Sequence, residues 1–148
     1  MKLIVPTNFQ DELIHRLDIR NVYSVYGKLS SDFVGGGRPS FILPHISRRR
    51  LQEYIKKVHA VNIEFSYLLN STCLGNREFS IAGHRNLRSL LDWLMRIKVD
   101  SVVVAMPYIA HFIRKNYPRL KIHACVTANI DSLIKARFCE DLGVSQIA

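Results

Sequence analysis

The chain has 148 residues, 48% of them hydrophobic, and a net charge of +9. This composition excludes a disordered chain and suits one domain over residues 1–148, and no apolar run is long enough to predict a membrane span. Because Pro6 ends the first apolar run, we expect neither a signal peptide nor an anchor, and we expect a cytoplasmic protein. The excess positive charge predicts RNA or an anionic ligand as a partner and no membrane contact.

Apolar runs and helical periodicities alternate along the chain. Six strands separated by five helices are typical of parallel βαβ units, because parallel neighbours need a crossover and a helix supplies it. The expected strands are 2–5, 22–26, 63–69, 101–106, 122–126 and 144–147, and the expected helices are 9–17, 48–60, 86–97, 108–116 and 132–142.

Polar residues gather on one face of several strands. Phe65 and Tyr67 alternate with Ser66, and Ile122 alternates with His123. A barrel has one face toward its helices and another toward a lumen that can hold polar residues, whereas strands covered by helices on both faces are continuously apolar. The sequence therefore predicts an α/β fold that is a partial, TIM-barrel-like sheet, and an open doubly wound sheet is the alternative.

The length does not suffice for a closed barrel. An eight-fold barrel takes about 250 residues. We therefore expect this chain to be the N-terminal part of a larger β/α barrel, either as a truncated product or completed by a second chain.

Barrel enzymes build their sites from the loops after the strands, which directs attention to Lys28, Asn70 and Asn129. An asparagine amide can hydrogen-bond a polar ligand as donor and acceptor. Asparagine is also a common helix N-cap, so capping is the alternative for both.

Two further polar residues lie on the expected lumenal face of their strands. His123 has a pKa near neutrality and suits a general base, or it fills the lumen as a hydrogen-bonded structural residue. Glu64 needs a cation nearby, such as Lys28 or His123, and is either a site carboxylate or half of a buried ion pair.

The three cysteines are expected to be reduced packing residues. Cys73, Cys125 and Cys139 are odd in number and lack the spacing of a metal site, which argues against a disulfide framework and predicts no metal. Cys125 follows His123 on the same strand face, about 7 Å away by the rise of a strand, which is too far for a direct dyad.

The glycine-rich stretch 34–39 does not meet the requirements of a phosphate-binding motif. It lacks a following Gly-Lys-Ser/Thr and a GxGxxG pattern, and Pro39 prevents a helix from starting there. Its long connection after a strand predicts a mobile loop at the site, in which Arg38 can meet an anion. The arginine run 48–50 opens a helix and is either a solvated face or an RNA contact.

The last third of the chain carries a specific order of motifs. These are VDSV at 99–102, YP at 117–118, IHA at 122–124 with Asn129, Ala136 and Phe138, and LGV at 142–144. Their order and spacing resemble the collagenase-like protease family, the U-type peptidases of unassigned mechanism. The helix 49–60 and Asn70 extend a looser resemblance over nearly the whole chain.

The resemblance implies an N-terminal barrel portion and a peptidase or hydrolase function. Other members resemble accessory proteins for hydroxylation of RNA bases or of the ubiquinone ring, which use an iron–sulfur cluster. The family's Glu and paired-cysteine signature belongs to a region beyond Ala148, and the three cysteines here match none of its positions. We therefore assign no catalytic residue and expect no cofactor in this chain, with a cluster only in a full-length relative. A non-catalytic basic RNA-binding module and an inactive truncated remnant remain the alternatives.

Overall fold

Six parallel strands form one sheet, in which each strand pairs with the next along the chain in the order β1-β2-β3-β4-β5-β6. The computed structural model describes residues 3–37 and 40–147. The strands are β1 (Leu3–Pro6), β2 (Val22–Gly27), β3 (Glu64–Leu69), β4 (Ser101–Val104), β5 (Lys121–Ala124) and β6 (Gln146–Ile147). The helices are α1 (Asp11–Arg16), α2 (Arg48–Ala60), α3 (Ile81–Arg96), α4 (Pro107–Asn116) and α5 (Leu133–Asp141), with short 3₁₀ turns η1 (Ser40–Ile42), η2 (Arg77–Phe79) and η3 (Val126–Ala128).

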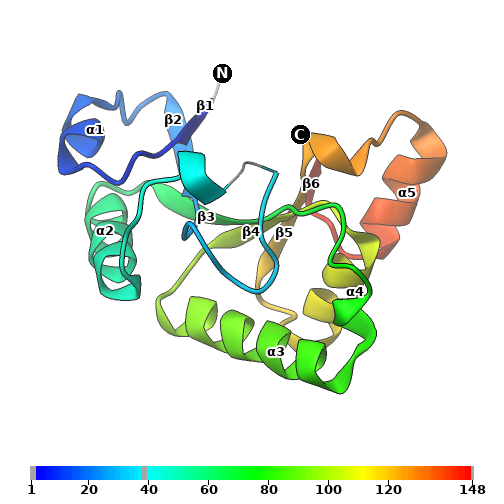
Figure 1. Ribbon diagram of the computed structural model, residues 1–148. Helices are drawn as coiled ribbons and strands as arrows, with labels where there is room; N and C mark the ends of the chain where they lie inside the picture. Colours follow the sequence, from blue (N-terminus) through cyan, green and yellow to red (C-terminus); the bar gives the residue numbers. More distant parts are fainter. Residues whose placement is uncertain (1–2, 38–39, 148) are drawn as a thin grey trace.

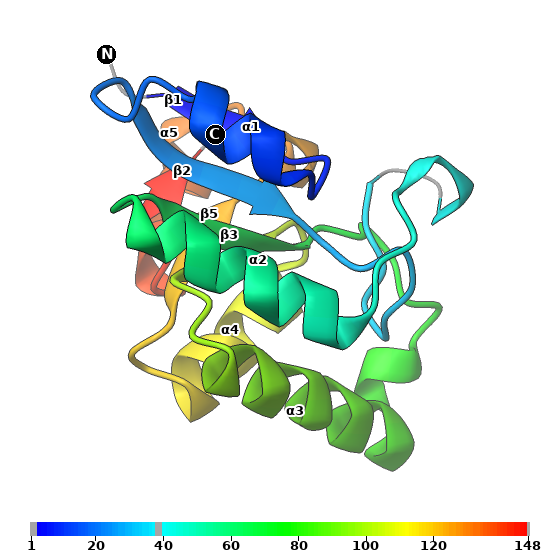
Figure 2. The same cartoon turned by 90° about the vertical axis from the view of Figure 1, so that its left-hand side faces the viewer.

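The sheet curls into half a barrel, with the helices around its outer side (Figure 1). Figure 2 shows α2 and α3 lying along the outer face of the strands, with α1 beside β1 and β2. The sequential strand order confirms the partial TIM-barrel-like fold and differs from a doubly wound sheet, in which the order reverses at a switch point.

The core lies between the outer face of the sheet and the helices. Phe65, Tyr67 and Leu69 of β3 are fully buried there, and so is Val102 of β4. The helices meet them with the buried residues Leu51, Tyr54, Ile55, Leu87, Leu91, Leu94, Ile109 and Ile113. The alternation seen in the sequence thus separates an apolar outer face from a more polar concave face.

Two helix starts differ from the sequence-based expectation. Phe9 has a positive φ of 62° and is buried, so the chain turns there and α1 begins only at Asp11. Helix α3 begins at Ile81, before its apolar stripe, because the Ser80 hydroxyl accepts a hydrogen bond from the Gly83 N–H. A Cβ at Gly83 would lie 1.8 Å from the carbonyl oxygen of Arg77, so the first turn has no room for a side chain. In the described part of the chain, no helix combines the length and apolarity needed to cross a membrane.

Candidate functional site

A cavity of about 390 Å³ opens on the concave side, toward the carboxyl ends of the strands. Its wall is largely apolar and includes Phe9, Leu43, Leu68 and Val103. The polar residues that line it are Thr7, Tyr26, Lys28, Ser66, Asn70, His123, Cys125, Thr127 and Gln146. An apolar cavity with a few converging polar groups is the common form of a ligand site.

Lys28 follows β2 and is held by a buried ion pair. Its side chain is 3% exposed, and Nζ lies 2.9 Å from Oδ2 of Asp32, whose side chain is 2% exposed. Asp32 also accepts hydrogen bonds from the Tyr67 hydroxyl, at 2.7 Å, and from the N–H groups of Val34 and Gly35. The aspartate thereby joins the start of the glycine loop to the wall of the cavity.

Asn70 connects the glycine loop to the opposite wall. Its Oδ1 accepts a hydrogen bond from the Gly37 N–H at 3.2 Å, and its Nδ2 donates to the Cys125 Sγ at 3.3 Å. The predicted site loop therefore contacts the cavity at Gly37, whereas Arg38, proposed as its anion ligand, lies outside the described residues.

The Cys125 side chain is half-buried and lines the cavity, so it is not the core packing residue expected from the sequence. Burial opposes ionisation of the thiol, but hydrogen bonds from the side chains of Asn70 and Thr127 and the N–H groups of the following turn hold its pKa below the ordinary value. A thiol in such surroundings is more nucleophilic at neutral pH than an unperturbed one.

His123 lies on the concave face of β5 and is only 6% exposed. Burial lowers the pKa of its imidazole, and the nearby Glu64 carboxylate opposes this shift. Among the described residues, no hydrogen-bond partner of the ring is found within bonding distance. The general-base and structural interpretations of His123 both stay predictions.

Glu64 is paired with a cation that the sequence did not indicate. Lys121 Nζ lies 2.7 Å from its Oε1, while Lys28 is bound to Asp32. Burial raises the pKa of the Glu64 carboxyl, but hydrogen bonds from Lys121 and Tyr23 and the charges of Lys121 and His123 outweigh it, so the pKa lies below its usual value. Of the two cations expected near Glu64, Lys28 is therefore paired elsewhere, and His123 lowers the pKa of Glu64 only when its ring is protonated. The sequence did not indicate Lys121 because β5 begins at this residue, one position before the predicted start of the strand.

Asn129 does not contribute to this cavity. It is exposed at a φ of 52°, and its carbonyl oxygen accepts a hydrogen bond from Lys135 Nζ at 3.1 Å. Helices α3 and α5 are capped by Ser80 and Ser132, so neither Asn70 nor Asn129 is the helix N-cap proposed as their alternative. Of the six predicted residues, Lys28, Asn70 and His123 meet at the cavity, whereas Glu64 is not part of its lining and acts on His123 through its charge.

Asp32 and Tyr67 support Lys28 from outside the cavity lining and were missed, whereas Cys125 was considered but assigned to packing. Asp32 stands four residues after Lys28, a spacing that is informative only once a turn brings both side chains together. Tyr67 was assigned to the apolar face, yet its hydroxyl reaches over the strand end to Asp32.

The arginine run at the start of α2 is largely engaged within the molecule. Arg49 pairs with Glu53 at 2.9 Å, and Arg50 pairs with Asp11 at 2.9 Å. Arg48 lies over the ring of Trp93, 4.8 Å from its centroid. These contacts are compatible with the solvated-face interpretation of the run, and the RNA contact stays a prediction.

The cavity can support binding and thiol chemistry. It brings together an ammonium group, an amide, an imidazole and a thiol of lowered pKa. In the described ranges, no group of three or more His, Cys, Asp or Glu residues is arranged to hold a metal ion. The expected absence of a cofactor stays a prediction.

Comparison with known proteins gives consistent matches. The model of peptidase family U32 matches residues 42–148. The chain is 29% identical over 116 residues to the uncharacterized protease MJ1657 of Methanocaldococcus jannaschii, covering 78% of this chain and 34% of that protein. The chain thus spans about a third of the length of this curated relative.

Two solved structures share the fold. The U32 peptidase Mk0906 superimposes with a TM-score of 0.78 at 22% identity, covering 99% of this chain and 57% of that one. The YdjI aldolase of Escherichia coli K12 superimposes with a TM-score of 0.58 at 17% identity, covering 93% of this chain and 48% of that one. These likenesses concern the fold, whereas the family model covers most of the sequence. The chain, with its half-barrel and its motifs from Val99 onward, therefore belongs to peptidase family U32.

Proposed function

We propose that the protein takes part in the hydrolysis of peptide bonds and that the cavity at the strand ends is its substrate site. The observation that carries this proposal is the meeting of Lys28, Asn70, His123 and Cys125 around one cavity of about 390 Å³. Membership of a peptidase family supports the reaction class. The mixed lining suits a peptide, whose backbone is polar and whose side chains are often apolar.

The open half-barrel suits completion by further βα units. Among the described residues, strand β6, which has two residues, pairs only with β5. Helix α5 exposes Leu133, Ile134 and Phe138, at 68%, 82% and 50%. The matched part of Mk0906 is 57% of its chain, so that relative has a large remainder beyond it. We infer that a second chain, or further βα units of the same protein, covers α5 and the edges at β1 and β6.

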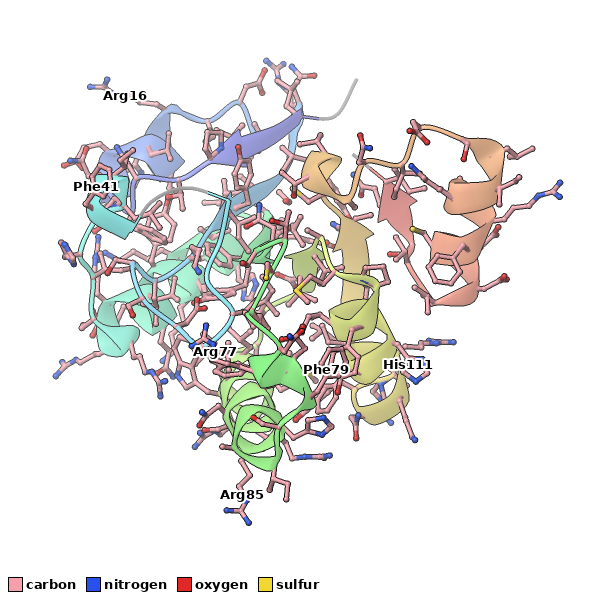
Figure 3. The ribbon with its side chains drawn as sticks, turned by 45° about the vertical axis from the view of Figure 1, so that its right-hand side comes forward. Arg16, Phe41, Arg77, Phe79, Arg85 and His111 are labelled. Atoms are coloured by element: carbon pink, nitrogen blue, oxygen red, sulfur yellow. The ribbon has the colours of Figure 1, made fainter. Side chains whose placement is uncertain are left out.

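The hydrolase proposal is tested with quenched fluorescent peptides of mixed sequence, assayed with the purified protein. Asn70→Ala and Lys28→Met are expected to lower kcat/KM about 10- to 100-fold, because each removes a polar group from the site. Arg16→Ala is the matched control, since Arg16 is exposed on α1 and away from the cavity (Figure 3). Cleavage that is absent from the wild type, or unchanged in both cavity variants, contradicts the proposal.

RNA binding is the second candidate function. The surface that favours it is not the arginine run 48–50 predicted from the sequence. Figure 3 shows Phe79, Arg85 and His111 on the side that carries α3 and α4, while Arg77 lies beside the long connection before α2, 5.6 Å from the Phe33 ring centroid. Phe79 is 63% exposed and packs against the Tyr108 ring at 4.9 Å. In the described part of the chain, no ion pair joins Arg77 or Arg85 to a carboxylate. Arg77 donates to the Leu74 carbonyl oxygen at 2.9 Å, so Arg85 is the better placed of the two arginines to meet a phosphate, with the exposed Phe79 ring available to a base.

Fluorescence anisotropy with a labelled 20-nucleotide oligouridine tests the RNA candidate. Arg85→Ala and Phe79→Ala are expected to weaken binding, and a steep loss of affinity with salt is expected because arginines displace counterions. Arg49→Ala is the control, since this guanidinium is already paired with Glu53. Absence of binding at low ionic strength eliminates the RNA candidate, and absence of both activities leaves the inactive remnant.

A further inference from the structure

The three cysteines have different surroundings, and only one of them lines the large cavity. Cys73 is exposed in the loop after β3, and Cys139 is half-buried on α5. Cys125 follows β5, lines the cavity and accepts a hydrogen bond from Asn70 Nδ2 at 3.3 Å. The amide of Asn70 is itself held by the Gly37 N–H, so the donor that faces the sulfur is fixed from both sides.

The second observation is the imidazole of His123 on β5, two residues before Cys125 in the chain. This side chain is 94% buried and lines the same cavity, and no described residue hydrogen-bonds its ring. Neither ring nitrogen is among the fully buried side-chain atoms of the described residues that lack a partner, so the ring nitrogens are reached from the cavity, where a ligand or water can bond to them. Its surroundings from other strands are Glu64 and Lys121, which form an ion pair with each other at 2.7 Å.

We propose that Cys125 is the nucleophile of this cavity and that it forms a transient thioester with the acyl group of a peptide substrate. This inference rests on the hydrolase function proposed above and names the attacking atom. The apolar part of the wall, which includes Leu43, Leu68 and Val103, suits a substrate with an apolar side chain next to the scissile bond.

The reaction balances with water as the only co-reactant. The Cys125 sulfur attacks the amide carbon, a C–S bond forms, and the carbonyl electron pair moves onto oxygen. When the oxyanion collapses, the C–N bond breaks and the leaving nitrogen takes the proton that the thiol lost. Water then attacks the thioester, releases the carboxylic acid and returns a proton to the sulfur.

His123 is the proton carrier in this scheme. Its pKa lies below the usual value because of burial, so the ring is neutral at pH 7 and can accept the thiol proton. Same-face neighbours on a strand lie about 7 Å apart, so a water molecule or the leaving nitrogen must lie between the ring and the sulfur. The negative charge of the Glu64 carboxylate stabilises the imidazolium that forms transiently.

Chemical labelling of the intact protein tests the nucleophile directly. The protein is treated with iodoacetamide and with a leucine-containing tripeptide chloromethyl ketone from pH 5 to 9, and each cysteine is followed by peptide mass spectrometry. At pH 7 we expect Cys125 to react faster than Cys139, because the Asn70 amide and the N–H groups of the following turn stabilise the Cys125 thiolate. Asn70→Ala is expected to move the pH profile of Cys125 to higher pH, whereas Cys139→Ser is expected to leave it unchanged.

Peptide hydrolysis provides the second measurement. Cys125→Ser is expected to lower kcat at least about 100-fold and to abolish capture of the chloromethyl ketone, because an alcohol is a much weaker nucleophile at neutral pH. If Cys125→Ser cleaves peptides at the wild-type rate, the nucleophile assignment is overturned while the hydrolase proposal stands. If Cys125 is captured rapidly but no peptide is cleaved, the hydrolase proposal is overturned while the reactive thiol is upheld. Labelling confined to Cys73 and Cys139 overturns the inference outright.

Discussion

Lys28 Nζ and Asp32 Oδ2 form an ion pair at 2.9 Å in which both side chains are almost fully buried. The pair joins the end of β2 to the first turn of the long connection before α2. Asp32 has the larger set of partners, because it also accepts from Tyr67 and from the N–H groups of Val34 and Gly35. The two members therefore contribute differently to stability.

Asp32→Ala is expected to destabilise the protein by about 3–5 kcal/mol, because it leaves the Lys28 ammonium buried and unpaired. Lys28→Met is expected to cost less, since Tyr67 and the loop N–H groups still satisfy the carboxylate. Urea unfolding followed by circular dichroism measures both free energies of unfolding. Equal losses in the two variants contradict this asymmetry.

Gly36 lies too close to the site for a side chain. A Cβ at this position would lie 2.9 Å from Cδ of Lys28 and 3.2 Å from Oδ1 of Asn70, and the buried ion pair prevents Lys28 from moving freely. Gly36→Ala is expected to lower the free energy of unfolding by about 1–3 kcal/mol through overpacking. Gly37→Ala is the matched control, because its Cβ would make only an ordinary contact of 3.5 Å. A Gly36→Ala variant as stable as this control contradicts the prediction.

Three serines on neighbouring strands form a buried ladder on the concave face. The Ser66 hydroxyl lies 3.1 Å from Oγ of Ser24 and 2.7 Å from Oγ of Ser101. Ser66→Ala is expected to cost about 1–3 kcal/mol, because it leaves two buried hydroxyls without this partner. Ser24→Ala removes one contact only and is expected to cost less. Thermal unfolding of both variants measures the order, and a larger loss in Ser24→Ala contradicts it.

The Glu64–Lys121 pair predicts a pH dependence. The pKa of Glu64 in the folded protein lies below its ordinary value of 4.5, so the group stabilises the fold above about pH 4.5 and loses this contribution as the pH falls through the folded pKa. Lys121→Met removes the bonded cation, so the pKa of Glu64 is expected to rise and the acid-unfolding midpoint to move to higher pH. NMR titration of the Glu64 carboxyl carbon measures the pKa.

A matched control uses a pair on the surface. Lys135 forms an exposed ion pair with Asp131 at 2.9 Å, so Lys135→Met is expected to leave both the Glu64 pKa and the acid midpoint almost unchanged. The same displacement of the midpoint in both variants would show that net charge, and not the Glu64 pair, controls acid unfolding.

The order of strands and helices and the inward direction of polar residues could be read from the sequence. These features follow from local rules, because side chains alternate along a strand and parallel strands need a helical crossover. Helix α2 begins and ends where its pattern predicts, since Ser47 caps it and its apolar residues keep helical spacing. The order of motifs from Val99 onward, which carries the family resemblance, could likewise be recognised from the sequence alone.

The partners inside the site were decided by the tertiary structure. Glu64 meets Lys121 across 57 residues of sequence, and Asn70 meets Cys125 across 55. Each pair depends on the register between strands and on their stagger in the curled sheet, and neither quantity is encoded in local spacing. For the same reason, the sequence predicted Cys125 to be a packing residue. Its place in the cavity depends on β3 and β5 lying on either side of β4, which the sequence does not give.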